Sequence, residues 1–198
     1  MKVYSLPGWY LAGRRDVEPF FTQKNKHGDK TQVTSPCGKY QLDIERYKTG
    51  EHGWDYSRGI VCERKTGAKI AEIKKCAPNF WYCWVGKFLL CAEDPQGYTV
   101  VDLENKKTYT YVDPKARAGL GFEWVEVQPS PNGRFLAVQG TYMGTGQMTV
   151  VYDFTNPTKF PLPKLRALET DGKARLKGWI GNHLRVEDGD ELKIIKLE

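Results

Sequence analysis

The chain has 198 residues, of which 40% are hydrophobic, 27% are charged and 13% are aromatic. This balance excludes a disordered, collagen-like or coiled-coil chain and indicates a single folded domain, and the many aromatic residues favour β structure. Thirty lysines and arginines stand against 24 aspartates and glutamates, which gives a net charge of +6.

The N-terminal segment does not resemble a targeting signal. Residues 1–13 contain apolar side chains, but a proline and a glycine interrupt them and Arg14 and Arg15 follow. No apolar run in the chain approaches the about 20 residues that cross a bilayer. The five cysteines form no Cys-x-x-Cys pair, which is typical of reduced thiols that pack in a core. We therefore expect an intracellular protein that contacts no membrane and holds no metal or other cofactor.

An internal repeat organises the rest of the chain. Four glycines, Gly38, Gly86, Gly133 and Gly181, follow one another at intervals of 47 or 48 residues. Each glycine opens a strand-like run, another such run precedes it, and a further run follows. A repeat of this kind has to be recognised before any fold is assigned, because it defines the structural unit.

The first two repeats predict nearly complete sets of strands. The expected strands are residues 38–44, 59–62 and 68–73 in the first repeat, and residues 80–85, 86–91, 98–101 and 108–112 in the second. Residues 80–85 are apolar on both alternating faces, so both faces of this strand must be covered by other parts of the protein.

The last two repeats are less regular. The expected strands are residues 122–127, 133–138 and 148–152 in the third repeat, and residues 176–180, 181–186 and 192–195 in the fourth. Pro161 and Pro163 weaken the outer strand of the third repeat, which suits an edge position. The fourth repeat reaches Glu198 without a last strand, whereas residues 1–6 form a spare strand-like run.

Four short antiparallel strands in a repeat of this length are typical of a β-propeller blade. We expect an all-β domain over residues 1–198, a small propeller of four blades of about 48 residues closed by the N-terminal strand. The expected blades are residues 30–75, 76–113, 120–165, and 174–198 together with 1–7. The alternatives are a half-propeller that forms a dimer and a β-sandwich in which the glycine spacing is coincidental.

Short motifs carry a family resemblance. Ser35-Pro36-Cys37-Gly38-Lys39-Tyr40 and Ser130-Pro131-Asn132-Gly133-Arg134-Phe135 resemble the S-P-D-G-K-x-L-A signature of WD40-like (TolB-type) propeller repeats. The runs Val100–Leu103 and Val150–Phe154 are similar to the strand that follows this signature. The chain departs from true WD40 repeats because it has no Gly-His dipeptide. The resemblance implies a fold and a habit of binding other molecules, without implying a particular chemistry.

The charge and the longest loops point to one candidate binding face. Residues 1–75 contain 15 lysines and arginines and 9 acidic residues, so they account for the whole net charge. The longer within-blade loops are expected at residues 47–58 and 140–147, and exposed Trp, Tyr and Arg are typical of binding hot spots. The predicted binding residues are Arg14, Arg15, Lys48, His52, Trp54, Tyr56, Arg58 and Tyr142. Alternatively, Trp54 and Tyr56 fold back to cover a blade edge, and the charges only keep the protein soluble.

No catalytic residue is predicted. The three histidines have no spacing typical of ligands or bases, and the glycine-rich residues 140–146 lack the Lys-Ser/Thr of a phosphate-binding loop. We therefore expect a monomeric, non-enzymatic binding or scaffold module whose partner is an acidic or phosphorylated protein surface. The alternatives are a binder of nucleic acid or of a phosphate ligand, which rests on charge alone, and a hydrolase or lyase with a site in the central channel.

Overall fold

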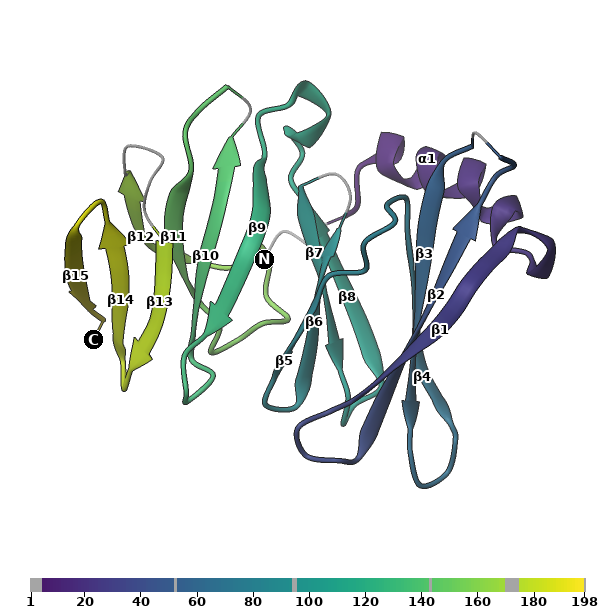
Figure 1. Ribbon diagram of the computed structural model, residues 1–198, viewed down its shortest axis with the longest axis horizontal. Coiled ribbons are helices and arrows are strands. Elements are labelled where there is room, and N and C mark those ends of the chain that lie inside the picture. Colours follow the sequence, from purple (N-terminus) through teal and green to yellow (C-terminus); the bar gives the residue numbers. More distant parts are fainter. Residues whose placement is uncertain (1–4, 52, 94–95, 143, 170–174, 198) are drawn as a thin grey trace. The chain divides into compact units, whose positions relative to one another are not determined.

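The computed structural model describes residues 5–51, 53–93, 96–142, 144–169 and 175–197 (Figure 1). Contacts along the chain divide it into two compact units. The first unit comprises residues 1–94 and 98–112, and the second comprises residues 95–97 and 113–198. Each repeat forms one antiparallel sheet in which neighbouring strands are consecutive in the chain. These sheets confirm the predicted β fold at this level.

The first unit contains sheets A and B. Sheet A consists of β1 (Lys26–Thr34), β2 (Tyr40–Lys48), β3 (Asp55–Glu63) and β4 (Lys69–Lys75). Sheet B consists of β5 (Tyr82–Val85), β6 (Phe88–Glu93), β7 (Gly97–Asp102) and β8 (Lys107–Val112). The two sheets share a core in which Leu42, Ile44 and Val61 of sheet A join Leu89 and Val101 of sheet B. As the apolar character of residues 80–85 requires, Phe80 is buried in this core.

The second unit contains sheets C and D. Sheet C consists of β9 (Phe122–Pro129), β10 (Phe135–Tyr142), β11 (Met148–Asp153) and β12 (Lys164–Glu169). Sheet D consists of β13 (Arg175–Ile180), β14 (His183–Asp188) and β15 (Glu191–Lys196). Their shared core includes Phe135, Val151, Leu184 and Val186. Trp179 stacks on Phe135 with the ring centroids 6.3 Å apart, and its indole N–H donates to the carbonyl oxygen of Gln128.

The Ser-Pro-x-Gly motifs form the tight turns that lead into β2 and β10. The Ser35 hydroxyl oxygen accepts the N–H of Tyr40 at 3.0 Å, and the Ser130 hydroxyl oxygen accepts the N–H of Phe135 at 2.9 Å. The glycine of the first motif, Gly38, has φ of +72°, a conformation that glycine adopts without a steric penalty. A side-chain hydrogen bond and a left-handed glycine therefore explain why this motif begins a strand in both repeats.

Helix α1 (Gly8–Val17) was not predicted. It contains two glycines, has no side-chain hydrogen bond at its N-cap, and buries only Tyr10. Its sequence is therefore a weak helix signal, and a helix of this length depends on packing against the rest of the unit. The short 3₁₀ turns η1 (Glu18–Phe20) and η2 (Gln23–Asn25) connect it to β1, and η3 (Ala116–Ala118) precedes β9.

Three other expectations need correction. Residues 55–58 were expected in a loop, but they belong to β3 because they pair in register with residues 45–48 of β2. Pro161 and Pro163 were expected within the outer strand of the third repeat, but they lie before it, because β12 begins at Lys164. Residues 1–4 of the expected N-terminal strand lie outside the described residues, and residues 5–7 form no strand.

Candidate binding site

The loop between β2 and β3 holds Trp54 in an exposed position. Thr49 closes this loop, because its N–H donates to the carbonyl oxygen of Trp54 at 3.2 Å and its Oγ1 accepts the Trp54 N–H at 3.1 Å. Gly50, with φ of +74°, makes the turn possible. Trp54 is nevertheless 84% exposed. A backbone held by hydrogen bonds therefore presents a large aromatic side chain to solvent.

Tyr56 is the centre of an aromatic cluster that joins the end of α1 to sheet A. It is only 4% exposed, and its ring lies 5.0 Å from that of Phe21 and 5.8 Å from that of Tyr47. Its hydroxyl donates to the carbonyl oxygen of Phe20 at 3.1 Å. Tyr56 therefore packs against Phe21 and Tyr47, while Trp54, two residues earlier, faces solvent.

An apolar cavity of about 320 Å³, which we call the Trp54 pocket, lies beside this loop. Its lining residues come from α1, η1, the β2–β3 loop, β3 and the segment after β4: Val17, Phe20, Thr49, Trp54, Asp55, Tyr56 and Cys76. The carboxylate of Asp55 is its one formal charge. The Oδ1 atom of this carboxylate is shielded from solvent and accepts no hydrogen bond from the described residues. A cavity of this size and composition is typical of ligand sites.

A network of ionic hydrogen bonds stands on the same sheet. Glu45 is buried and accepts hydrogen bonds from Lys26 at 2.7 Å, from Nη2 of Arg58 at 2.6 Å and from the hydroxyl of Tyr47 at 2.8 Å. Burial alone would raise the pKa of the Glu45 carboxyl, but these three donors outweigh it and lower the pKa to about 2. Arg58 also pairs with Glu72. Its guanidinium is therefore engaged within the protein.

A second polar cluster is almost completely buried. Lys75 and Glu93 are 2% and 4% exposed, and Nζ of the lysine lies 3.2 Å from Oε1 of the glutamate. Glu93 also accepts hydrogen bonds from the hydroxyls of Tyr10 at 2.8 Å and Thr99 at 2.6 Å. Burial, together with the nearby Glu93 carboxylate, raises the pKa of Tyr10. Because Tyr10 belongs to α1 and Glu93 belongs to β6, their hydrogen bond attaches the helix to sheet B.

The predicted binding residues occupy different environments. The described part of the first unit contains six of them: Arg14, Arg15, Lys48, Trp54, Tyr56 and Arg58. Arg14 lies over the ring of Tyr10 at 5.6 Å, whereas Arg15 and Trp54 are exposed. His52 lies outside the described residues. Tyr142 ends β10 in the second unit, where its hydroxyl accepts a hydrogen bond from Lys164 at 2.8 Å.

Sequence reasoning missed the residues that complete the Trp54 pocket. Val17 and Phe20 lie in a segment for which no structure was predicted, and Cys76 was expected to be a core thiol but is exposed. The buried Lys75 had a detectable signal, because it continues the alternation of Ala71 and Ile73 on the inward face of β4. The paired aromatic residues after Pro19 have no counterpart in the repeat and so gave no comparable signal.

Two features are absent from the described residues. No group of three or more histidines, cysteines, aspartates and glutamates in this part of the chain could hold a metal ion. Within the same residues, no helix is both long and apolar enough to cross a membrane.

Comparison with solved structures decides the nature of the repeat. Prolyl oligopeptidase B from Galerina marginata superimposes with a TM-score of 0.57 over 97% of this chain and 32% of its own, at 14% sequence identity. Its matching part is a β-propeller. The chain has a β-propeller fold. The β-propeller domain of the trilobed protease from Pyrococcus furiosus also matches, with a TM-score of 0.48 and 10% identity over 88% of this chain and 58% of its own.

The resemblance to propeller repeats is therefore confirmed at the level of the fold. The number of blades in a closed ring, and its closure by residues 1–7, stay predictions. No family model matches the chain. A protein of Acanthamoeba polyphaga mimivirus, described as uncharacterized, is 31% identical over 144 residues, which are 71% of this chain. The match spans 57% of the viral protein's length.

Proposed function

We propose that this protein is a non-enzymatic binding module that engages a partner protein through the Trp54 pocket and the surface around it. The observation that carries the proposal is the 84% exposure of Trp54 beside an apolar cavity. Tryptophan is enriched at the energetic centres of protein interfaces. The hydrogen bonds of Thr49 hold the loop in place, so binding would require little reordering of its backbone.

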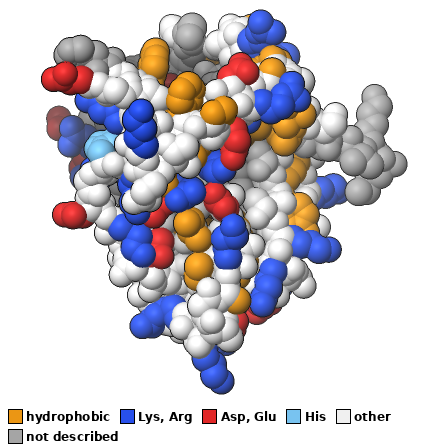
Figure 2. Space-filling view, turned by 90° about the vertical axis from the view of Figure 1, so that its right-hand side faces the viewer, with side chains coloured by type: hydrophobic (Ala, Val, Ile, Leu, Met, Phe, Trp, Pro, Cys, Tyr) orange, Lys and Arg blue, Asp and Glu red, His pale blue; other side chains and the backbone are white. Residues whose placement is uncertain are grey.

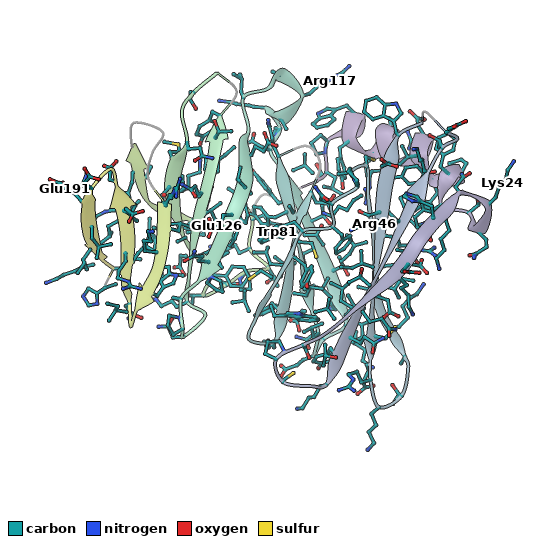
Figure 3. The ribbon with its side chains drawn as sticks, in the orientation of Figure 1. Lys24, Arg46, Trp81, Arg117, Glu126 and Glu191 are labelled. Carbon is teal, nitrogen blue, oxygen red and sulfur yellow. The ribbon has the colours of Figure 1, made fainter. Side chains whose placement is uncertain are left out.

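Positive surface charge contributes less to the proposed binding than the sequence predicted, because several charged side chains pair within the protein. Glu45 is paired with Lys26 and Arg58, and Glu18 is paired with Lys74. Figure 2 shows one face of the protein, on which lysines and arginines lie among aspartates and glutamates. Exposed cations do remain, among them Lys24, which projects from the ribbon in Figure 3. These cations favour a partner with an acidic or phosphorylated surface. Most of the binding affinity comes from the contact area.

A binder of nucleic acid or of a phosphate ligand is the alternative, and the net charge of +6 favours it. The two functions differ in their dependence on salt and on Trp54. Retention on RNA or heparin that falls steeply with salt, and that Trp54→Ala leaves unchanged, would favour the alternative.

The proposal is tested by quantitative affinity capture from the native host. Wild-type protein is immobilised beside the Trp54→Ala variant and a control, Leu120→Ala, which removes another exposed apolar side chain that is 61% exposed in the second unit. We expect specific proteins to be retained by the wild type and the control but lost by Trp54→Ala. With a purified partner, the loss should reach about 30- to 1,000-fold in affinity. Equal retention by all three proteins would contradict the proposal.

A further inference from the structure

The aromatic rings at this end of the first unit differ in what covers them. Three rings each have a cation of the chain above them: Arg14 over Tyr10 at 5.6 Å, Lys74 over Phe21 at 5.2 Å and Arg58 over Tyr47 at 5.2 Å. The three rings that line the Trp54 pocket are Phe20, Trp54 and Tyr56. Among the described residues, no cation lies over any of these three. The rings of Phe20 and Trp54, which are 42% and 84% exposed, are therefore available to a positively charged group from outside, whereas Tyr56 is stacked on Tyr47.

Asp55 places a negative charge beside these rings. Its Oδ1 accepts no hydrogen bond from the described residues, and the nearest basic group is Nε2 of His27 at 3.6 Å. Aromatic faces and a carboxylate both stabilise a cation. The net positive charge of the whole chain does not exclude such a guest, because salt screens charges beyond about 8 Å.

The walls of the pocket also discriminate among cations. An unmodified lysine ammonium has three N–H donors, and each must find an acceptor when water is removed. The pocket offers few acceptors, because its lining is mostly apolar and Oγ1 of Thr49 already accepts the Trp54 N–H. Methylation of the ammonium removes these donors, keeps the charge and adds apolar surface. A methylated ammonium therefore matches the pocket better than a free one.

We propose that the Trp54 pocket binds the methylated ammonium group of a lysine side chain on the partner protein. The inference rests on the proposed function for its source of lysine. In the complex, the exposed rings of Phe20 and Trp54 contact the cation, and Asp55 balances its charge. The volume of about 320 Å³ leaves room for the methyl groups and part of the lysine stem.

The test compares ligands of equal shape and different charge. The probes are N-acetyl-Nε-trimethyl-lysine amide, its neutral isostere in which carbon replaces the quaternary nitrogen, the unmethylated lysine derivative, and free choline. Binding is followed by NMR through the indole N–H signal of Trp54, which is assigned by its absence in Trp54→Ala. We expect the trimethyl-lysine derivative to bind about tenfold more tightly than the neutral isostere and the unmethylated lysine. Equal binding of the isostere, or no binding of any probe, would overturn the inference.

Matched variants separate the carboxylate from general electrostatics. Asp55→Asn removes the charge and keeps the shape, whereas Glu51→Gln removes a charge from the same loop outside the pocket lining. Asp55→Asn should weaken trimethyl-lysine binding about five- to tenfold. Glu51→Gln should change it less than twofold. An equal effect of the two variants would contradict a specific role for Asp55.

Failure of this inference can be told apart from failure of the proposed function. If Trp54→Ala loses host proteins but no methylated probe binds, the binding module stands and the methylammonium assignment is wrong. If trimethyl-lysine binds but Trp54→Ala retains the same host proteins as the wild type, the proposed function is wrong. The assignment of the methylated lysine to a partner protein is then wrong as well. Binding of choline as tight as that of trimethyl-lysine would show that the lysine stem contributes nothing, which also overturns the lysine source.

Discussion

Replacing Glu45 by glutamine should remove a large, pH-dependent share of the stability of the first unit. The carboxylate of Glu45 is buried and accepts ionic hydrogen bonds from Lys26 and Arg58. The fall of its pKa from the ordinary 4.5 to about 2 corresponds to about 3 kcal/mol of stabilisation at neutral pH. The two cations are about one quarter exposed, so solvent relieves part of the loss in the variant. We expect Glu45→Gln to lose about 2–3 kcal/mol at pH 7.

The sign of the pH dependence follows from the direction of the shift. Because the folded state lowers the pKa, the stabilisation is complete above the pKa of the unfolded chain, near 4.5, and is lost as the pH falls through about 2. The difference between wild type and Glu45→Gln should therefore shrink to less than half between pH 7 and pH 3. Urea unfolding, followed by circular dichroism at several pH values, measures this difference.

A control carboxylate identifies the reason for any change. Glu104 forms an ion pair with Lys87 in which both side chains are largely exposed. Glu104→Gln should therefore leave the free energy of unfolding unchanged within error at every pH. If Glu45→Gln lost the same free energy at pH 3 as at pH 7, the loss would come from packing, and the electrostatic argument would be refuted.

Three further predictions concern stability and assembly. Glu93→Gln should destabilise the protein by about 3–5 kcal/mol in urea unfolding, because Lys75 would remain buried without its carboxylate; a loss below about 1 kcal/mol would contradict the buried pair. Gly59→Ala should cost about 1–3 kcal/mol and lower the melting temperature, because the new Cβ would lie 2.2 Å from Cζ of Phe80; an unchanged melting temperature would show that the ring moves aside freely. If residues 1–7 complete the last blade, their deletion should lower stability by several kcal/mol, and light scattering of the intact chain should give a monomer mass. A truncated protein that melts like the full chain would refute the closure, and a stable dimer would favour the half-propeller.

Local signals in the sequence predicted the sheets well. The spacing of Gly38, Gly86, Gly133 and Gly181 placed the turns before the second strand of each sheet, where each of the four glycines has a positive φ. Period-two alternation placed the strands that follow. Both signals act within a few residues, through backbone sterics and the pleat of a strand. Helix α1 was not predicted because its own residues favour a helix only weakly. The contacts of Tyr10 with sheet B supply the remaining stabilisation of the helix.

The environments of the predicted binding residues were harder to predict than the strands. The sequence picked out Trp54 and Tyr56 together as aromatic residues in one loop. The longer hairpin of β2 and β3 separates them, since Tyr56 becomes part of β3 and Trp54 remains in the loop. Arg58 likewise pairs with Glu45 across the two strands. Register between strands therefore decided which of these side chains remains exposed.

By itself, the sequence determined the repeat, the turns and the alternation of strands, because those depend on neighbours along the chain. Only the tertiary structure decided which polar groups are buried and where a cavity forms. The Trp54 pocket draws on residues 17, 20, 49, 54–56 and 76, and the buried pair joins Lys75 to Glu93 of the other sheet. Burial and enclosure depend on segments that meet only when the sheets pack and α1 docks. No local pattern in the chain encodes that meeting, which is why the pocket appears only in the folded protein.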